Sequence, residues 1–180
     1  MQTDGNGDGG AVATTLDGVT VRGERNLMAD SAAPGLAGAR AALETFYYAF
    51  NTRSLDLMKQ IWADDPLIQA DTPIVSLVRG SATIATLYER GFASPARIQS
   101  ALEDIVAYVA PELVVFTGRE HGSYASGSAQ AAPETPEVRT TCVCVFRFIP
   151  AQGGWRQVYH HVAIGDAEQL AQFQRTVRGA

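Results

Sequence analysis

The 180-residue chain has little of what marks several common classes of protein. It contains two cysteines and three histidines, and its 14 lysines and arginines form no basic cluster, which argues against a nucleic-acid partner. Its apolar runs stay well short of the roughly 18 residues that a membrane span needs, so we expect no membrane partner. The first 30 residues lack both a basic start and a continuous apolar stretch. We therefore expect no signal peptide, and a cytoplasmic location.

The cysteines and histidines also argue against a metal site. Cys142 and Cys144 lie two apart in a strand-like segment, so their α-carbons would be about 6.5–7 Å apart, at or beyond the disulfide limit. We expect buried thiols in a reducing compartment. His160 and His161 are adjacent and would face opposite sides of a strand, so they cannot form a metal pair. We therefore expect no metal and no cofactor.

What the chain does have is enough apolar material for one folded domain. Hydrophobic residues make up 46% of it, and the formal net charge is −5. Residues 1–33 are rich in Gly, Asp, Ala and Thr and carry few large apolar side chains, so we expect a flexible N-terminal tail. Residues 34–180 then form the domain.

Periodicity predicts helices first and strands afterwards. Apolar residues recur at helical spacing over 39–50, after Ser54, which is a candidate N-cap, and again after Gly80-Ser81. Residues 67–70 are expected to form a short strand between the second and third helices. Alternating strand patterns follow over 97–109, 112–124, 138–149 and 155–164, and a helix capped by Asp166 ends the chain. This order indicates an α+β fold in which three N-terminal helices cover one face of a curved antiparallel sheet.

Three segments of the sequence resemble one family. Phe50–Asp65 resembles the corner between the first two helices of nuclear transport factor 2-like proteins, and Arg79–Ile84 the entry to their third helix. Gly154–Ala163 is similar to the last strand of the polyketide cyclase-like (SnoaL-like) branch, in which a Trp opens the strand and a His follows six residues on. The resemblance implies a cone-shaped, cystatin-like roll that encloses an apolar pocket, usually in a homodimer. It does not imply one function, because this fold serves both enzymes and binding modules.

Strand alternation and the resemblance together select the side chains that face this pocket. On the last strand, Tyr159 and His161 share the inward parity of Trp155, whereas His160 points away. Glu120 faces inward on an earlier strand, while Arg119 and His121 face outward. Tyr159, His161, Glu120 and Asp71 are the candidate catalytic residues. The candidate substrate-binding residues are Phe46, Phe50, Trp62, Tyr88, Phe116, Cys144 and Phe146, a lining that suits a small hydrophobic molecule.

The ketosteroid isomerase branch of the family provides a direct comparison. Its mechanism uses a helix tyrosine and a strand aspartic acid as an oxyanion hole, and a second aspartate as base. These positions correspond here to Phe46, Cys144, and Ala70 or the adjacent Asp71. The sequence therefore does not support ketosteroid isomerisation by that route.

Two functions stay open at this point. The chain is interpreted as a dimeric module that binds a small hydrophobic molecule. The alternative is a cofactor-free lyase, isomerase or cyclase that acts on a small carbonyl compound, with His161 and Glu120 exchanging protons and Tyr159 donating to an oxyanion. Four outward valines, Val143, Val145, Val158 and Val162, would lie in the dimer interface.

Overall fold

The computed structural model describes residues 10–125 and 137–178. Residues 1–9 of the expected tail lie outside the described residues. In the described part, a seven-stranded sheet has the order β1-β4-β5-β6-β7-β2-β3. Its elements, in chain order, are β1 (Val12–Thr15), the 3-10 helix η1 (Asp30–Ala32), α1 (Gly35–Thr52), α2 (Leu55–Ile61), β2 (Gln69–Thr72), β3 (Val75–Arg79), α3 (Ser81–Ala93), β4 (Arg97–Ala110), β5 (Leu113–Ala125), β6 (Glu137–Ile149), the 3-10 helix η2 (Pro150–Gln152), β7 (Gly154–Ala163) and α4 (Ala167–Arg178).

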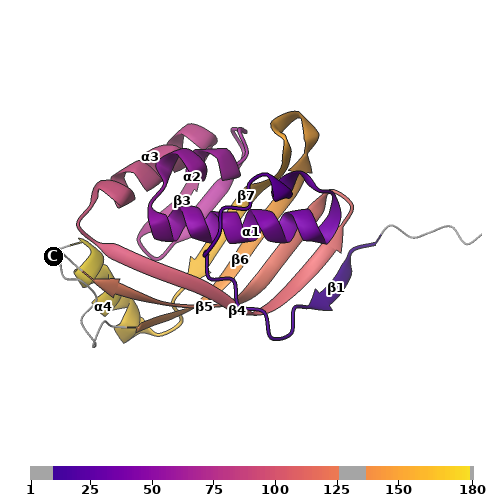
Figure 1. Cartoon of the computed structure of the whole chain (residues 1–180). Helices are drawn as coiled ribbons and strands as arrows, with labels where there is room; N and C mark the ends of the chain where they lie inside the picture. The colour runs from indigo at the N-terminus through magenta and orange to yellow at the C-terminus, as the bar shows by residue number, and fades with distance from the viewer. Residues whose placement is uncertain (1–9, 126–136, 179–180) are drawn as a thin grey trace, which may run out of the picture.

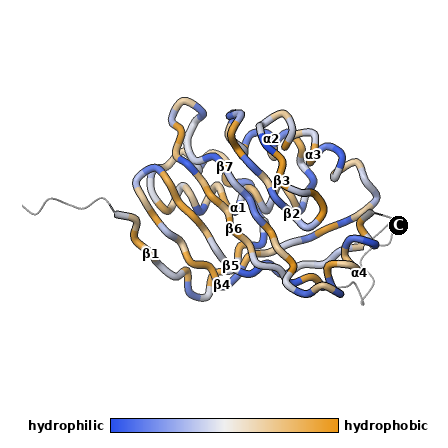
Figure 2. Tube along the Cα trace, turned by 180° about the vertical axis from the view of Figure 1, so that it is seen from behind, coloured by the Kyte–Doolittle hydropathy of each residue, from blue (hydrophilic) through white to orange (hydrophobic). Residues whose placement is uncertain are grey.

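The α+β prediction is confirmed. Helices α1, α2 and α3 lie on one side of the curved sheet, and α4 lies near the far end of the long strands (Figure 1). Asp166 accepts a hydrogen bond from the backbone N–H of Gln169 and so caps α4, as expected. Hydrophobic and hydrophilic residues are interleaved along the strands (Figure 2), which is the pattern of a sheet with one buried face.

The four long strands were predicted to within one residue at each end, but two short strands, β1 and β3, were missed. β3 pairs antiparallel with β2, and β2 runs parallel to β7. The sequence over 67–70 predicted a single short strand in this region. Asp71, one of the candidate catalytic residues, lies within β2.

Two β-bulges bend the sheet around the helices. In β4, the register with β5 shifts between Glu103 and Val106, and Asp104 adopts a φ of 52° there. In β7, Phe146 and Val145 of β6 pair with Gln157 and Tyr159, which leaves Val158 as the extra residue. A bulge bends its strand and reverses the side-chain alternation beyond it.

The N-terminal segment differs from the prediction over its described part. β1 pairs antiparallel with β4, and Val21 bridges to Leu102 and is buried in the main core. Farther along, the Trp155 indole donates a hydrogen bond to the carbonyl of Ala33. Residues 10–33 therefore pack against the domain. They do so through short contacts with β4 and α1, and the prediction had considered only long apolar stretches as a sign of packing.

Helix α1 is buried on more than one side. Its Phe46 and Tyr47 are both 1% exposed. The N-terminal segment covers the flank that the sheet does not, with Glu44 accepting hydrogen bonds from the backbone of Glu24 and Arg25. Among the described residues, no helix combines the length and apolar character that crossing a membrane requires.

Candidate functional site

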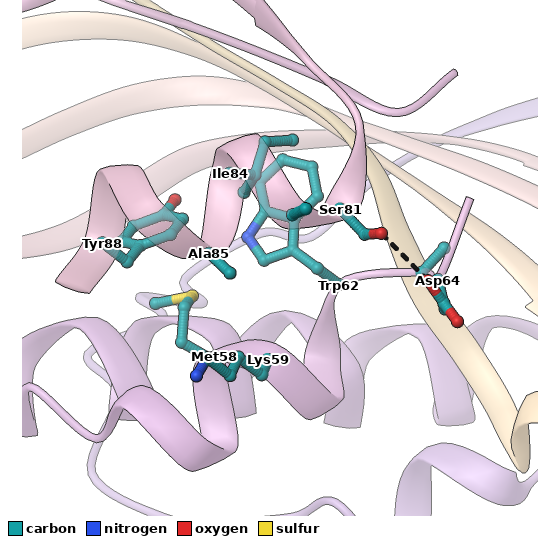
Figure 3. Close-up of a pocket in the computed structure, with 10 residues that line it drawn as sticks. Met58, Lys59, Trp62, Asp64, Ser81, Ile84, Ala85 and Tyr88 are labelled. Carbon is teal, nitrogen blue, oxygen red and sulfur yellow. Dashed lines mark hydrogen bonds between the residues drawn. The ribbon is translucent and has the colours of Figure 1, made fainter. Parts of the chain in front are cut away.

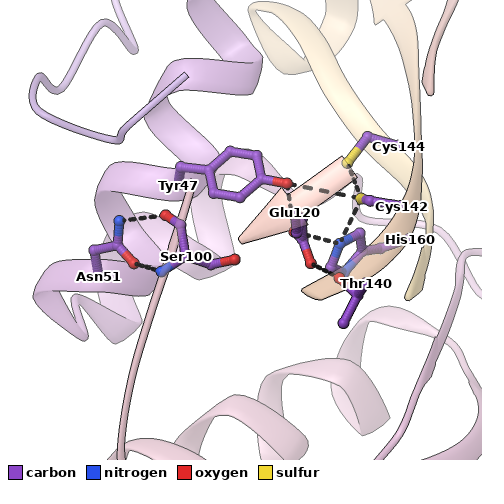
Figure 4. Close-up of polar contacts among 8 residues, drawn as sticks. All are labelled: Tyr47, Asn51, Ser100, Glu120, Thr140, Cys142, Cys144 and His160. Atoms are coloured by element: carbon purple, nitrogen blue, oxygen red, sulfur yellow. Dashed lines mark hydrogen bonds and ion pairs between the residues drawn. The ribbon is translucent and has the colours of Figure 1, made fainter. Parts of the chain in front are cut away.

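A cluster of polar side chains lies on the concave face of the sheet, beneath α1 (Figure 4). All of its members are at least nine-tenths buried. They come from α1, β5, β6 and β7, and we call them the polar cluster: Tyr47, Glu120, Thr140, Cys142, Cys144 and His160.

Glu120 lies at the centre of the polar cluster, and its inward orientation was predicted correctly. The Tyr47 hydroxyl donates to its Oε1 at 2.5 Å, and the Thr140 hydroxyl donates to its Oε2 at 3.1 Å. His160 Nε2 lies 4.0 Å from Oε1. The carboxylate therefore has a donor on each oxygen and an imidazole beside it, which is how a buried charged group avoids a large desolvation penalty.

Tyr47 reaches this carboxylate because α1 is fixed across the sheet. One turn after Tyr47, the Asn51 side chain donates to the Ser100 carbonyl of β4 and accepts from the Ser100 N–H, both at 2.9 Å. The helical pattern selected Phe46 for the site and not the adjacent Tyr47. The pattern assumes that only one side of a helix is buried, whereas the N-terminal segment covers a second side of α1. Tyr47 was therefore missed.

The two thiols lie beside His160. The Sγ atoms of Cys142 and Cys144 are 3.5 Å apart, and Cys142 Sγ is 3.6 Å from His160 Nε2. Both cysteines are free and buried, as predicted. The Tyr47 hydroxyl also lies 3.7 Å from Cys142 Sγ, so the thiols and the carboxylate belong to one connected group.

Burial and close contacts shift the acidities in this group in different directions. Burial by itself raises the pKa of Cys144, but the hydrogen bond with Cys142 and the charge of His160 outweigh it and lower the pKa to about 6. The contact with Cys144 and burial raise the pKa of Cys142. Burial tends to lower the pKa of His160, yet the neighbouring Cys144 charge leaves it raised. Burial, and then the charge of Glu120, raise the pKa of Tyr47, which keeps this tyrosine a donor.

The predicted inward set on β7 is wrong beyond Gln157. Because Val158 is a bulge residue, His160 pairs with inward-facing Cys144 and packs on the Phe46 ring, with centroids 4.9 Å apart. His161 pairs with Val143 on the other face. The prediction that His161 faces inward and His160 outward therefore fails at the bulge.

Three of the four candidate catalytic residues lie together on this outer face, away from Glu120. His161 Nδ1 is 3.4 Å from the Asp71 carboxylate, and its ring stacks on Tyr159 at 6.4 Å. All three side chains are half-buried. Their grouping follows from the pairing of β2 with β7, which the sequence did not reveal.

A pocket of about 390 Å³ opens between α2 and α3 (Figure 3). Trp62 and Tyr88, two of the predicted substrate-binding residues, line it. The full lining is Met58, Lys59, Trp62, Ala63, Asp64, Ser81, Ala82, Ile84, Ala85 and Tyr88. Its volume lies within the range of roughly 300–1,000 Å³ that is typical of small-molecule sites.

The other predicted substrate-binding residues pack in the hydrophobic core. Phe116, Cys144 and Phe146 are fully buried there, and Phe46 is 1% exposed, with Phe50 packed against the same core. Aromatic contacts nevertheless link the pocket to the polar cluster. Ring centroids are 6.4 Å apart for Trp62–Tyr88, 5.7 Å for Tyr88–Phe92, 6.4 Å for Phe50–Phe92, 6.4 Å for Phe46–Phe50 and 4.9 Å for Phe46–His160.

Tyr88 has electrostatic contact with the polar cluster as well. Burial is the main factor that raises the pKa of Tyr88, and the side chain of Trp62 partly offsets it. Negative charge on Cys144 and Glu120 adds to the rise. Tyr88 thus lies between the pocket on one side and the polar cluster on the other.

Three buried polar side chains on this side of the molecule have atoms with no hydrogen-bond partner among the described residues. They are the indole Nε1 of Trp62, both amide atoms of Gln157, and Nδ1 of His160. Trp62 forms an isolated bridge with Gln157, so the two lie on adjacent segments. Buried polar groups are nearly always satisfied, and an exception calls for a specific cause such as a ligand, a water or an ion.

Comparison with known proteins agrees with this architecture. Solved structures with the same fold include a candidate calcium/calmodulin-dependent protein kinase type II association domain from Thiobacillus denitrificans. It shares 26% identity and a TM-score of 0.56, over 71% of this chain and 94% of that one. A candidate dehydratase of the nuclear transport factor 2-like family from Streptomyces avermitilis shares 20% identity and a TM-score of 0.59, over 72% and 94% of the two chains.

The chain is thus a nuclear transport factor 2-like protein by fold. A family model described as a SnoaL-like domain matches residues 39–166, and the chain belongs to that family. No curated protein matches it. The sequence resemblance is confirmed at the level of fold and family.

Proposed function

We propose that this chain binds a small, largely apolar molecule that carries hydrogen-bonding groups, through the pocket between α2 and α3. The observation that carries the proposal is the buried indole N–H of Trp62, which lines the pocket and has no partner in hydrogen-bonding geometry among the described residues. Gln157, on the segment beside Trp62, carries further unpartnered polar atoms. A ligand that accepted a hydrogen bond from the Trp62 indole would remove a desolvation cost of about 1–3 kcal/mol. The apolar side chains of Met58 and Ile84 supply the remaining contact surface.

The two tryptophans provide an internal control for a binding experiment. The Trp155 indole N–H is hydrogen-bonded to Ala33, whereas the Trp62 indole N–H, near the Tyr88 ring, has no partner in hydrogen-bonding geometry among the described residues. In Figure 3 the nitrogen of Trp62 is turned toward Ala85 and Tyr88. A ligand in the pocket should therefore shift the nuclear magnetic resonance signal of the Trp62 indole and leave that of Trp155 almost unchanged.

The experiment is a titration of nitrogen-15-labelled protein with a panel of planar aromatic ketones and carboxylates, such as chromone, indanone and naphthoate. We expect a saturable shift of the Trp62 indole signal with at least one compound. In the Trp62→Phe variant the same compound should bind at least about tenfold more weakly, since the indole donor is gone. Equal shifts of both indole signals, or unchanged affinity in the variant, would contradict binding at this pocket.

A second candidate function is acid–base catalysis on a small carbonyl compound. It is favoured by Glu120, whose carboxylate has the Tyr47 hydroxyl at 2.5 Å and His160 at 4.0 Å. Such a set can remove a proton next to a carbonyl and stabilise the resulting oxyanion, with each proton-transfer group worth roughly 10²–10⁴ in rate. The candidate dehydratase from Streptomyces avermitilis is a structural neighbour, at an identity that supports the fold alone.

Proton exchange tests this second function without knowledge of the substrate. The ketones of the same panel are incubated with protein in deuterated water, and loss of their α-proton signals is followed. Glu120→Gln should abolish exchange that the wild type accelerates, while Glu103→Gln, a surface carboxylate paired with His121, should leave it intact. Ligand binding without any acceleration of exchange would limit the protein to a binding role.

We also propose that the chain forms a homodimer through the outer face of the sheet. Val115, Val143 and Val145 are half-buried on this face, next to Tyr159. Adjacent apolar side chains on an open sheet face favour association. Sedimentation should give a dimer for the wild type and a monomer for Val145→Glu, with Leu77→Glu on β3 as the control that stays dimeric.

A further inference from the structure

We propose that Cys142, Cys144 and His160 form a zinc site, with the Glu120 carboxylate as the fourth ligand. Three donor atoms of the polar cluster lie close together, and the Glu120 carboxylate lies beside one of them. We therefore revise the expectation from the sequence, which placed His160 on the opposite face of the sheet from the two cysteines.

The bulge in β7 assembles the three primary ligands. Cys142 and Cys144 lie two apart on β6 and point to the same side, and the extra residue Val158 turns His160 to that side as well. One donor atom from each of the three residues lies within 4.8 Å of the other two. Strand alternation alone would have separated the histidine from the thiols.

The distances match those of tetrahedral zinc. With Zn–S of about 2.3 Å and Zn–N of about 2.0–2.1 Å, two sulfurs should be about 3.8 Å apart and a sulfur and a nitrogen about 3.5 Å apart. The corresponding distances here are 3.5 Å between the two Sγ atoms and 3.6 Å between Cys142 Sγ and His160 Nε2. These two pairs therefore need only small movements to accept the ion, and the donor atoms of Cys144 and His160 lie within 4.8 Å of each other.

Glu120, on the neighbouring strand, is proposed as the fourth ligand, although its oxygens lie outside the group of three donor atoms that are within 4.8 Å of one another. Its Oε1 lies 4.0 Å from His160 Nε2, compared with about 3.4 Å for two ligands of one zinc ion. A shift of about 0.6 Å by the carboxylate would close this gap. Tyr47 and Thr140 donate hydrogen bonds to the carboxylate, and outer-shell donors of this kind hold a ligand in place and offset its charge.

The donor set selects the ion by its chemistry. Two thiolates and an imidazole prefer a borderline-soft divalent cation over magnesium or calcium, which take oxygen ligands. Binding replaces the protons of both thiols with the cation, so each ion bound releases up to two protons, and affinity falls as the pH falls.

The experiment uses the full chain, reduced and freed of metal by dialysis against a chelator. Zinc is titrated in competition with a chromogenic chelator, and cobalt is then used as a spectroscopic substitute. We expect one ion per chain. The cobalt form should show thiolate-to-metal charge-transfer absorption in the near ultraviolet and the strong visible bands of a tetrahedral site. A folded, reduced wild type without these bands would overturn the proposal.

Neighbouring residues provide matched variants. Cys142→Ser, Cys144→Ser and His160→Gln should each weaken binding by more than the roughly 10- to 100-fold that follows loss of an outer-shell partner. His161→Gln, one residue along but on the outer face beside Asp71, should bind as the wild type does. Unchanged binding in Cys144→Ser or His160→Gln would place the ion elsewhere and refute the site, and unchanged binding in Glu120→Gln would refute the fourth ligand.

Discussion

The hydrogen bond between Tyr47 and Glu120 gives the most direct test of the buried polar cluster. Tyr47→Phe removes one hydroxyl that is 2.5 Å from the carboxylate and leaves the ring in place. Tyr47 is 1% exposed and Glu120 is 7% exposed, so water has little access to replace the lost donor. Hydrogen bonds to charged groups contribute about 1.5–3 kcal/mol, and we expect a loss of that size in the free energy of unfolding.

The assay is urea unfolding of the wild type, Tyr47→Phe, Glu120→Gln and the double variant, all in the presence of a chelator so that bound metal does not contribute. Because the two side chains share one interaction, the double variant should be more stable than the sum of the single effects indicates, by at least about 0.5 kcal/mol. Tyr48→Phe, on the neighbouring and half-buried position, should change stability by less than about 0.5 kcal/mol.

A loss below about 0.5 kcal/mol for Tyr47→Phe would refute the reasoning, since a desolvated carboxylate cannot lose a donor without cost. Additive effects in the double variant would also refute it. They would mean that the two side chains do not interact in solution, and both the acid–base function and the outer shell of the proposed zinc site depend on that contact.

Four further predictions concern the N-terminal segment, the Cys144 thiol and the end of α1. Deleting residues 1–22, compared with deleting residues 1–9 alone, should cost at least about 2 kcal/mol of stability in urea unfolding, because Val21 leaves the core and β4 loses its partner β1. Ultraviolet titration of thiolate absorption in metal-free protein should show one group that ionises at about pH 6, which is absent in Cys144→Ser, and none near the ordinary thiol range. Because folding lowers the pKa of Cys144, its thiolate stabilises the fold above the ordinary thiol pKa, and this contribution should vanish as the pH falls toward 6. Arg53→Gly should lower the melting temperature although it relieves a positive φ of 58°, since the guanidinium donates to the carbonyls of Gly91, Phe92, Ser94 and Ala96.

Much of the fold could be predicted because its signals are local. Alternation over β5 and β6 correctly placed Phe116, Glu120 and Cys144 inside, since those strands run without a bulge where they pair with each other. The short strand β3 was missed because residues 71–79 show no periodicity that separates a strand from a loop. The packing of residues 10–33 was missed because it depends on pairing with distant β4, which composition does not encode.

The two errors inside the site have different physical causes, although each displaced the prediction by a single residue. The prediction selected Phe46 instead of Tyr47 because an amphipathic helix is assumed to bury one face. Helix α1 is instead covered both by the sheet and by the N-terminal segment. The prediction placed His161 inside instead of His160 because alternation is a local rule. One extra residue reverses the inward and outward positions for the rest of the strand. Val158 and Tyr159 are both half-buried, so burial does not distinguish the bulge residue from its neighbour. The bulge nevertheless determines which side chains meet in the interior. It places His161 on the outer face beside Asp71, and His160 on the inner face beside Glu120 and the two thiols. A sequence can thus indicate that a histidine is available for a site, while the register of one strand determines which histidine it is.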